Sequence, residues 1–516
     1  MTSKILLTNF ILVTIFTSQN IFAQKGNPRQ ANTFLTAGNY EQALEEYLLL
    51  LEDEPGNLKY NYRAGVCYLN SNIDKTKAIL YLEKVVNAGY DNNAYYLLGR
   101  AYHFAYQFDK AIEMFTKYKT IGGGTAASIT ETNNQIEYCH NAKEIVKYPL
   151  NVTFENLGNK INSIYPDYYP FMPIDESFIV FNSRRDDGSI ELENGKYTAN
   201  VYISKVVNGN YTDAVPLGKN INTPDGNEEI SGLSASGDIL LLYFDNFGGF
   251  GDLYLTTKKE QGFETPVILE KQINSHHEEI AASITRDGNA IYFASNRPGG
   301  YGGTDIYVSR KLPIGGWGPA QNLGAEINTE FDEDFPNISP DNTMLYFSSK
   351  GHTSMGGYDI FKSDWDKTKR SFSNVRNIGY PVNTTYDDMN FRVSETGRFG
   401  YIAAVRPGGY GDYDIYRVTF NDIEPRYTVI KGSISCADTS KRADDVYLLV
   451  IDKNSDLYGE YSPNLNTMRY IMILPPGEYN LDVEAGGFIP IHETINILDK
   501  SSFMTEIRKD IVLKDK

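Results

Sequence analysis

Short apolar stretches separated by polar, glycine-rich turns fill residues 148–422, and this pattern repeats. In each repeat a hydrophobic residue stands between a polar residue and an aromatic one: Asn200-Val201-Tyr202, Asp252-Leu253-Tyr254, Asp305-Ile306-Tyr307, Asp359-Ile360-Phe361 and Asp414-Ile415-Tyr416. The aromatic residues follow one another at intervals of 52, 53, 54 and 55 residues. A period of roughly 50 residues made of short strands and tight turns is typical of a β-propeller, with one four-stranded blade per repeat. The pattern therefore predicts a five-bladed β-propeller.

A second marker, an aliphatic residue followed by asparagine, runs in phase with the first. Its copies are Ile161-Asn162, Ile221-Asn222, Ile273-Asn274, Ile327-Asn328 and Val382-Asn383. The segment 154–162 also matches the segment 321–328, which ends a repeat. We therefore expect the segment that begins at residue 154 to supply the outer strand of the last blade, because an unclosed ring would expose a strand edge.

Residues 24–147 have a helical period instead. Gly65 and Gly99 are 34 residues apart, and each is followed three residues later by a tyrosine. Alanines recur at nearly the same interval, each four residues before a large side chain: Ala43, Ala78 and Ala111. Small residues let paired helices approach and large ones fill the groove between them, which is the tetratricopeptide pattern. The sequence predicts an α-helical solenoid that either holds a peptide on its concave face or serves as a structural spacer.

Residues 423–516 change composition again. The apolar stretches 429–434, 446–451 and 470–474 are predicted strands, and Pro475-Pro476-Gly477 predicts a turn. We expect a small antiparallel β-sandwich of transthyretin-like type. The whole chain is thus predicted to be a multidomain protein with α and all-β parts, because 516 residues exceed what one core holds.

The first 23 residues indicate export. Lys4 precedes an apolar stretch, residues 5–16, that is too short to span a bilayer, and Ala23 offers a small residue for cleavage before Gln24. The sequence predicts a signal peptide over residues 1–23; a buried N-terminal helix is the alternative. No cysteine follows the apolar stretch as a lipid attachment site. We expect an exported, periplasmic protein associated with the outer membrane.

The charge narrows the range of partners. A net charge of −18 and a pI near 4.9 exclude nucleic acid and disfavour an anionic membrane surface, because like charges repel. Cationic partners would be attracted, more strongly at low salt. Basic peptide segments are therefore among the expected partners.

Each Ile/Val-Asn marker is followed by an acidic loop just before a predicted innermost strand. The acidic residues are Asp167, Glu228, Glu229, Glu278, Glu279, Asp332, Glu333, Asp334, Asp387 and Asp388. In a propeller such loops meet near the central channel, where a ring of carboxylates would focus negative potential. The loops indicate one of three roles. They could form a receptor site for a basic peptide or a cation, or their side chains could cap turn amides. A catalytic role is the third alternative.

Enzymatic motifs are sparse. The turn Thr285-Arg286-Asp287-Gly288 resembles the Asp-box of sialidases, but that box is a structural turn, and nothing identifies the arginine cluster or nucleophilic tyrosine. A Gly-x-Ser-x-Gly nucleophile motif of the propeller-bearing peptidases is absent. The pair His276-His277 offers a weak metal site, and a solvated loop variant is the alternative. The sequence predicts no enzyme, no cofactor and no bound metal.

In order, the segments resemble a Bacteroidetes envelope architecture of signal peptide, tetratricopeptide repeats, TolB-like propeller with PD40-type repeats, and carboxypeptidase-regulatory-like domain. The turn 285–288, the segment Asn296-Arg297-Pro298-Gly299-Gly300 and the Gly-x-Asp-Ile-Tyr element that ends at Tyr307 are similar to PD40 repeats. Members commonly continue into an OmpA-like peptidoglycan-binding domain, which we do not expect here because the sequence ends at Lys516.

The resemblance implies a noncatalytic scaffold that binds other envelope proteins through its helical repeats and propeller. Some members of the family serve type IX secretion or gliding machinery, so support of that machinery is the leading expectation. The alternative is a propeller-based enzyme that acts on glycans or peptides, or a soluble ligand-binding protein.

Overall fold

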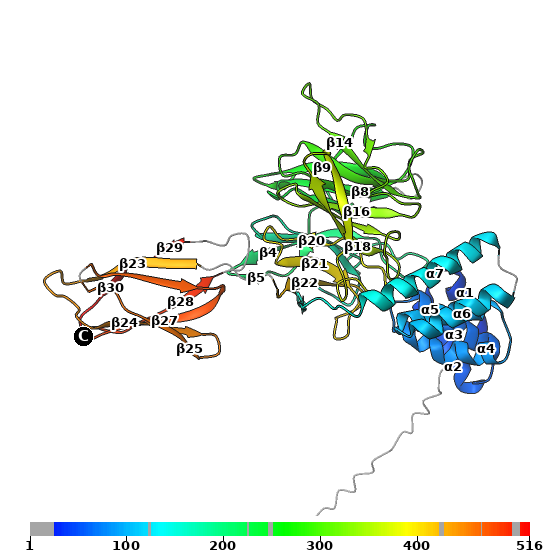
Figure 1. Ribbon diagram of the computed structural model, residues 1–516. Coiled ribbons are helices and arrows are strands. Elements are labelled where there is room, and N and C mark those ends of the chain that lie inside the picture. Colours follow the sequence, from blue (N-terminus) through cyan, green and yellow to red (C-terminus); the bar gives the residue numbers. More distant parts are fainter. Residues whose placement is uncertain are drawn as a thin grey trace, which may run out of the picture.

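The computed structural model describes residues 25–121, 125–223, 226–245, 251–422, 428–465, 467–497 and 506–516. The predicted signal peptide, residues 1–23, lies outside these residues. Figure 1 shows helices on one side of a central group of sheets and a second, smaller group of sheets on the other side. The chain thus combines an α-helical region with a β-propeller-like region and a C-terminal β region.

The helical region comprises α1 (Pro28–Thr36), α2 (Tyr40–Asp53), α3 (Leu58–Asn70), η1 (Lys75–Lys77), α4 (Ala78–Asn87), α5 (Asn93–Phe104), α6 (Phe108–Ile121) and α7 (Ala126–Ile145). The two periodic glycines lie where helices touch. A Cβ atom at Gly65 of α3 would stand 2.6 Å from Leu82 of α4, and one at Gly99 of α5 would stand 2.6 Å from Phe115 of α6. Glycine at these positions therefore allows the close approach that the sequence predicts.

Five antiparallel sheets follow. The first two contain β2 (Asp167–Phe171), β3 (Phe178–Ser183), β4 (Asn200–Val207), β5 (Asn210–Tyr211) and β6 (Val215–Pro216), then β7 (Asn227–Leu233), β8 (Ile239–Asp245), β9 (Asp252–Lys259), β10 (Gly262–Phe263) and β11 (Val267–Ile268). The next two contain β12 (Glu279–Ile284), β13 (Ala290–Ser295), β14 (Asp305–Arg310) and β15 (Gln321–Asn322), then β16 (Glu333–Ile338), β17 (Met344–Ser349), β18 (Asp359–Asp366) and β19 (Ser371–Asn377).

The fifth sheet joins the two ends of this region. It contains β20 (Arg392–Val393), β21 (Phe399–Ala404), β22 (Asp414–Phe420) and, as its outer strand, β1 (Val152–Asn156). β1 is antiparallel to β22, with Val152 opposite Phe420 and Asn156 opposite Tyr416. The prediction that the segment near residue 154 completes the last repeat is therefore confirmed.

The two sequence markers meet in each of these five sheets. The side-chain amide of the marker asparagine accepts a hydrogen bond from the backbone N–H of the central residue of the aromatic marker and donates one to its C=O. These pairs are Asn162 with Ile415, Asn222 with Val201, Asn274 with Leu253, Asn328 with Ile306, and Asn383 with Ile360. The asparagine thus fixes the return loop of each sheet to its third strand.

Three of these sheets contain a stacked pair of aromatic side chains. Rings stack between the second and third strands at nearly constant centroid distances, in Phe181 with Tyr202 (6.0 Å), Phe293 with Tyr307 (6.0 Å) and Phe347 with Phe361 (5.9 Å). A basic or imidazole side chain lies against each pair: Arg185, Arg297 and His352 respectively. The aromatic marker is therefore a core residue of its repeat.

The C-terminal region forms two further sheets. One contains β26 (Arg469–Leu474), β23 (Thr428–Cys436), β29 (Glu506–Arg508) and β30 (Ile511–Leu513); the other contains β25 (Leu457–Tyr461), β24 (Val446–Asp452), β27 (Gly477–Ala485) and β28 (Ile491–Ile497). Buried side chains of both sheets, Ile430 and Met472 from one and Leu448 and Val483 from the other, share one core.

Candidate functional site

The helical region is packed directly against the propeller-like region. Tyr138 of α7 donates a hydrogen bond to the backbone oxygen of Lys350 (2.7 Å), and Asn141 donates to that of Ser354 (2.9 Å). His103 of α5 lies 2.9 Å from the backbone oxygen of Met355, whose side chain is buried in the core of the helices. Several residues of one propeller loop thus lie against the helices.

His103 is an uncharged part of this contact. Its side chain is buried, and burial lowers the pKa of the imidazole to about 4. A carbonyl oxygen can only accept a hydrogen bond, so the Nε2 atom that faces Met355 carries the proton. The contact therefore requires a proton on Nε2, and the neutral ring present near pH 7 supplies it as the Nε2–H tautomer.

A chamber of about 590 Å³ lies between the two regions. The helices contribute Lys75, Arg100, His103, Phe104 and Glu131, and the propeller loops contribute Glu330, Phe331, Asp332, Lys350, Tyr386 and Asp387. Cationic, anionic and aromatic side chains thus line the same chamber.

Two of the chamber's charged groups are held by neighbours. Lys350 forms an ion pair with Asp332 (2.8 Å). Lys75 donates to the backbone oxygens of Leu69 and Ser71 at 2.9 and 2.6 Å, and burial lowers its pKa to about 8. Polar groups held in this way are pre-oriented, which lowers the entropy cost of binding a ligand.

A smaller cavity of about 220 Å³ adjoins the chamber and shares Asp387 and Tyr413 with it. Its walls include Tyr168, which donates a hydrogen bond to Glu229 (2.7 Å), and Arg184, which pairs with the same carboxylate (2.9 Å). This cavity also touches the inner strand β2.

An aromatic contact lies next to the smaller cavity. The rings of Tyr169 and Phe335, from two innermost strands, lie 4.8 Å apart, and Met389 packs in the same cluster. Both aromatic residues have positive φ angles, 52° and 50°, which bulky residues rarely adopt. The two rings therefore meet at a point where both innermost strands have this uncommon backbone conformation.

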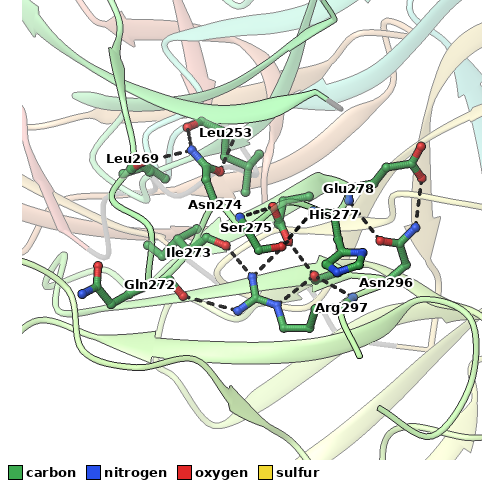
Figure 2. Close-up of polar contacts among 12 residues, drawn as sticks. Leu253, Leu269, Gln272, Ile273, Asn274, Ser275, His277, Glu278, Asn296 and Arg297 are labelled. Carbon is green, nitrogen blue, oxygen red and sulfur yellow. Dashed lines mark hydrogen bonds and ion pairs between the residues drawn. The ribbon is translucent and has the colours of Figure 1, made fainter. Parts of the chain in front are cut away.

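The ten acidic residues of the predicted ring fall into two sets of five. One carboxylate per repeat is buried and accepts hydrogen bonds from the backbone N–H and hydroxyl of a serine or threonine four or five residues earlier: Asp167, Glu228, Glu279, Glu333 and Asp388. Figure 2 shows this loop in the third repeat, where Ser275 and Arg297 are drawn in one polar network. These five carboxylates organise turns.

The other five carboxylates are distributed differently. Glu229, Asp332 and Asp387 line the two cavities, and Glu278 is exposed beside Asn296. Asp334 is buried and accepts a hydrogen bond from the backbone N–H of Phe335. The structure therefore brings three of the ten to two adjoining cavities that share Asp387, and binding by that set stays a prediction.

The buried carboxyl of Glu333 predicts a pH effect on stability. Burial raises its pKa from 4.5 to about 7. Its contribution to stability is complete below about pH 4.5 and is lost as the pH rises toward 7, because the unfolded chain releases this proton first. The loss amounts to about 3 kcal/mol at ~1.4 kcal/mol per pKa unit.

The variant Glu333→Gln is expected to flatten that dependence, since a neutral amide can bond the same hydroxyls of Thr329 and Ser349. Urea unfolding at pH 5 and pH 7.5 measures it, with the exposed Glu278→Gln as the matched control. An equal pH slope in wild type and Glu333→Gln would contradict the assignment.

Several residues of the site are not identified from the sequence. Lys75, Arg100, His103 and Glu131 lie on the helices and reach the chamber only because the two regions are packed together. From the sequence, Arg297 is named only within a segment similar to PD40 repeats, whereas in the structure it donates to the backbone oxygen of Ile273. Its equivalents Arg185, His352 and Arg406 make the same kind of contact, so a basic residue or histidine after the second strand was the available signal.

The described residues contain neither a membrane-spanning helix nor a cluster of metal ligands. None of their helices combines the length and apolarity needed to cross a membrane. Within the same residues, no group of three or more His, Cys, Asp or Glu side chains is arranged to hold a metal ion.

Comparison with known proteins concerns the propeller fold. No protein-family model and no curated protein matches the sequence. Among solved structures, TolB from Acinetobacter baumannii is similar over 49% of this chain and 55% of its own, with 17% identity and a TM-score of 0.31. The chain therefore spans about half the length of TolB.

Two further structures are those of enzymes. An α-L-arabinofuranosidase of Podospora anserina matches over 53% of this chain and 97% of its own (11% identity, TM-score 0.34), and the periplasmic gluconolactonase of Pseudomonas aeruginosa over 65% and 87% (12% identity, TM-score 0.27). These matches contradict two predictions, that the chain is a noncatalytic protein-binding scaffold and that it is not an enzyme.

Proposed function

We propose that the chamber binds a carbohydrate and that the protein acts on glycans. The observation that carries the proposal is the composition of the chamber walls: three cationic side chains, four carboxylates and several aromatic rings around one space of about 590 Å³. This volume falls in the range of about 300–1,000 Å³ that ligand pockets typically have.

A neutral polyol suits such walls better than a strongly charged ligand. Each hydroxyl both donates and accepts a hydrogen bond, so it can bind Lys75 or Arg100 as an acceptor and Asp332 or Asp387 as a donor. A ligand of one charge would meet groups of its own sign on the same wall. The rings of Phe104 and Tyr386, 4.9 Å apart, offer apolar surface for a sugar face.

The test is binding and turnover of neutral pentose and hexose oligosaccharides by the full chain. Calorimetry should detect a complex, and release of new reducing ends would show turnover. The double variant Asp332→Asn, Asp387→Asn is expected to weaken binding at least tenfold, about 1.4 kcal/mol, because each amide replaces an acceptor with a donor.

The exposed Glu278→Gln serves as the control, since Glu278 lies in an equivalent loop outside the chamber. Unchanged affinity in the double variant would place the ligand elsewhere. The absence of any binding across the panel would remove the proposal.

The finer description of the fold is likewise proposed. We infer that the helices form tetratricopeptide-like repeats, that the five sheets are the blades of one ring closed by β1, and that the C-terminal sheets form a transthyretin-like sandwich. The helix spacing, the β1–β22 pairing and the shared C-terminal core support these three assignments. Export to the periplasm rests on residues 1–23, and association with the outer membrane stays a prediction.

A further inference from the structure

An unpaired guanidinium lies among the innermost strands of the propeller-like region. Arg392 begins β20, and its side chain is only 7% exposed. Its Cζ atom lies 3.9 Å from the centre of the Phe171 ring of β2, and its Nη1 atom is 3.4 Å from the backbone oxygen of Pro336 in β16. It is thus enclosed by strands of three different sheets.

The two remaining nitrogens of this guanidinium have no partner. Nε and Nη2 are buried and make no hydrogen bond with any of the described residues. Nε and Nη2 form one edge of the planar group, with two parallel N–H bonds, and this is the edge that binds anions bidentately. The two nitrogens without a partner are therefore the pair that can donate to one acceptor together.

No carboxylate of the described residues forms an ion pair with Arg392. Burial alone lowers the pKa of its guanidinium, to about 9, so the group is still charged at pH 7. A buried charge without a counter-ion costs several kcal/mol, and native proteins pair such charges. The neighbouring residue Asn390, 1% exposed, also has both side-chain polar atoms unpartnered.

We propose that Arg392 holds a small monovalent anion of halide size on its Nε–Nη2 edge, near the axis where the innermost strands meet. The Arg392 Cζ atom lies over the Phe171 ring, and both unpartnered nitrogens are buried, so a small anion suits this site better than phosphate or a dicarboxylate. The anion would neutralise the charge that β20 places in the interior. This site is separate from the chamber and independent of the proposed function.

The test is thermal unfolding of the full chain at constant ionic strength, with bromide replacing gluconate. A ligand that binds only the folded state raises the melting temperature as its concentration rises. We expect a bromide-dependent increase in wild type, no such increase in Arg392→Met, and a normal increase in Arg286→Met, whose arginine is exposed. Equal bromide dependence in wild type and Arg392→Met would overturn the proposal.

A crystal grown in bromide provides the second measurement, which does not depend on folding of a variant. The expected result is a bromine anomalous peak within hydrogen-bond distance of Nε and Nη2 of Arg392. A crystal that shows bromide elsewhere only, or an ordered water at these atoms, would overturn the proposal.

Discussion

Replacing Asn328 with leucine is expected to lower the free energy of unfolding by about 2–5 kcal/mol. The variant leaves the backbone N–H of Ile306 without its acceptor at 2.8 Å. It also removes the hydrogen bonds that Nδ2 donates to Oδ1 of Asn322 and to the C=O of Ile306, which keeps the Leu323 N–H as a donor. A buried polar group left unsatisfied costs about 1–3 kcal/mol, and each other lost hydrogen bond costs about 1 kcal/mol. Denaturant unfolding of the full chain, followed by far-ultraviolet circular dichroism, measures the effect.

Two further variants identify the cause. Asn328→Asp keeps the oxygen that accepts from the Ile306 N–H. In the native protein Nδ2 donates to the oxygens of Ile306 and Asn322, and the variant places a carboxylate oxygen against both of them. We therefore expect it to be at least as destabilising as the leucine variant. The exposed Asn296→Leu should stay within about 1 kcal/mol of wild type. A leucine variant as stable as this control would show that the hydrogen bonds of the Asn328 amide do not stabilise the repeat.

Replacing Arg297 with methionine is expected to cost about 3–5 kcal/mol. Arg297 pairs at 3.0 Å with Glu279, a carboxylate with no exposed surface, and lies over the rings of Phe293 and Tyr307. Removing one partner of a buried ion pair leaves an uncompensated charge in the interior. Denaturant unfolding at pH 7 gives the change in free energy.

A double-mutant cycle separates the lost charge from lost packing. Adding Glu279→Gln to Arg297→Met removes the stranded charge and should recover part of the stability, so the two substitutions would be non-additive. Arg286→Met, at an exposed ion pair, should cost no more than about 1 kcal/mol. Strict additivity in the cycle would mean that packing over the rings, not charge, carries the effect.

The sequence predicts this fold well because its markers are structural contacts. Asn328 and Ile306 recur in phase since the side chain of one bonds the backbone of the other in every repeat. The period, the helical and strand segments, and the return of the N-terminal segment to the last sheet all follow from such local requirements.

The candidate site was less predictable. Asp332, Glu333 and Asp334 form one acidic cluster in the sequence, yet the first lines the chamber, the second caps a turn and the third lies in the interior. Successive side chains of a strand point to opposite faces, so proximity in the sequence does not give a common environment. The chamber itself depends on how the helices pack against the propeller loops. No spacing of residues along the sequence indicates that packing.

The pairing of β1 with β22 also determines how this protein responds to mechanical force. β1 follows the helices, β22 precedes the C-terminal sheets, and the residues nearest those flanking regions, Val152 and Phe420, are opposite each other at one end of the ladder. Tension between the flanking regions, once it has released the helices from the propeller loops, therefore loads the hydrogen bonds one after another rather than together. The sheet of β1 and β22 would therefore separate progressively from the Val152–Phe420 pair, at a lower force than shearing the same ladder would need.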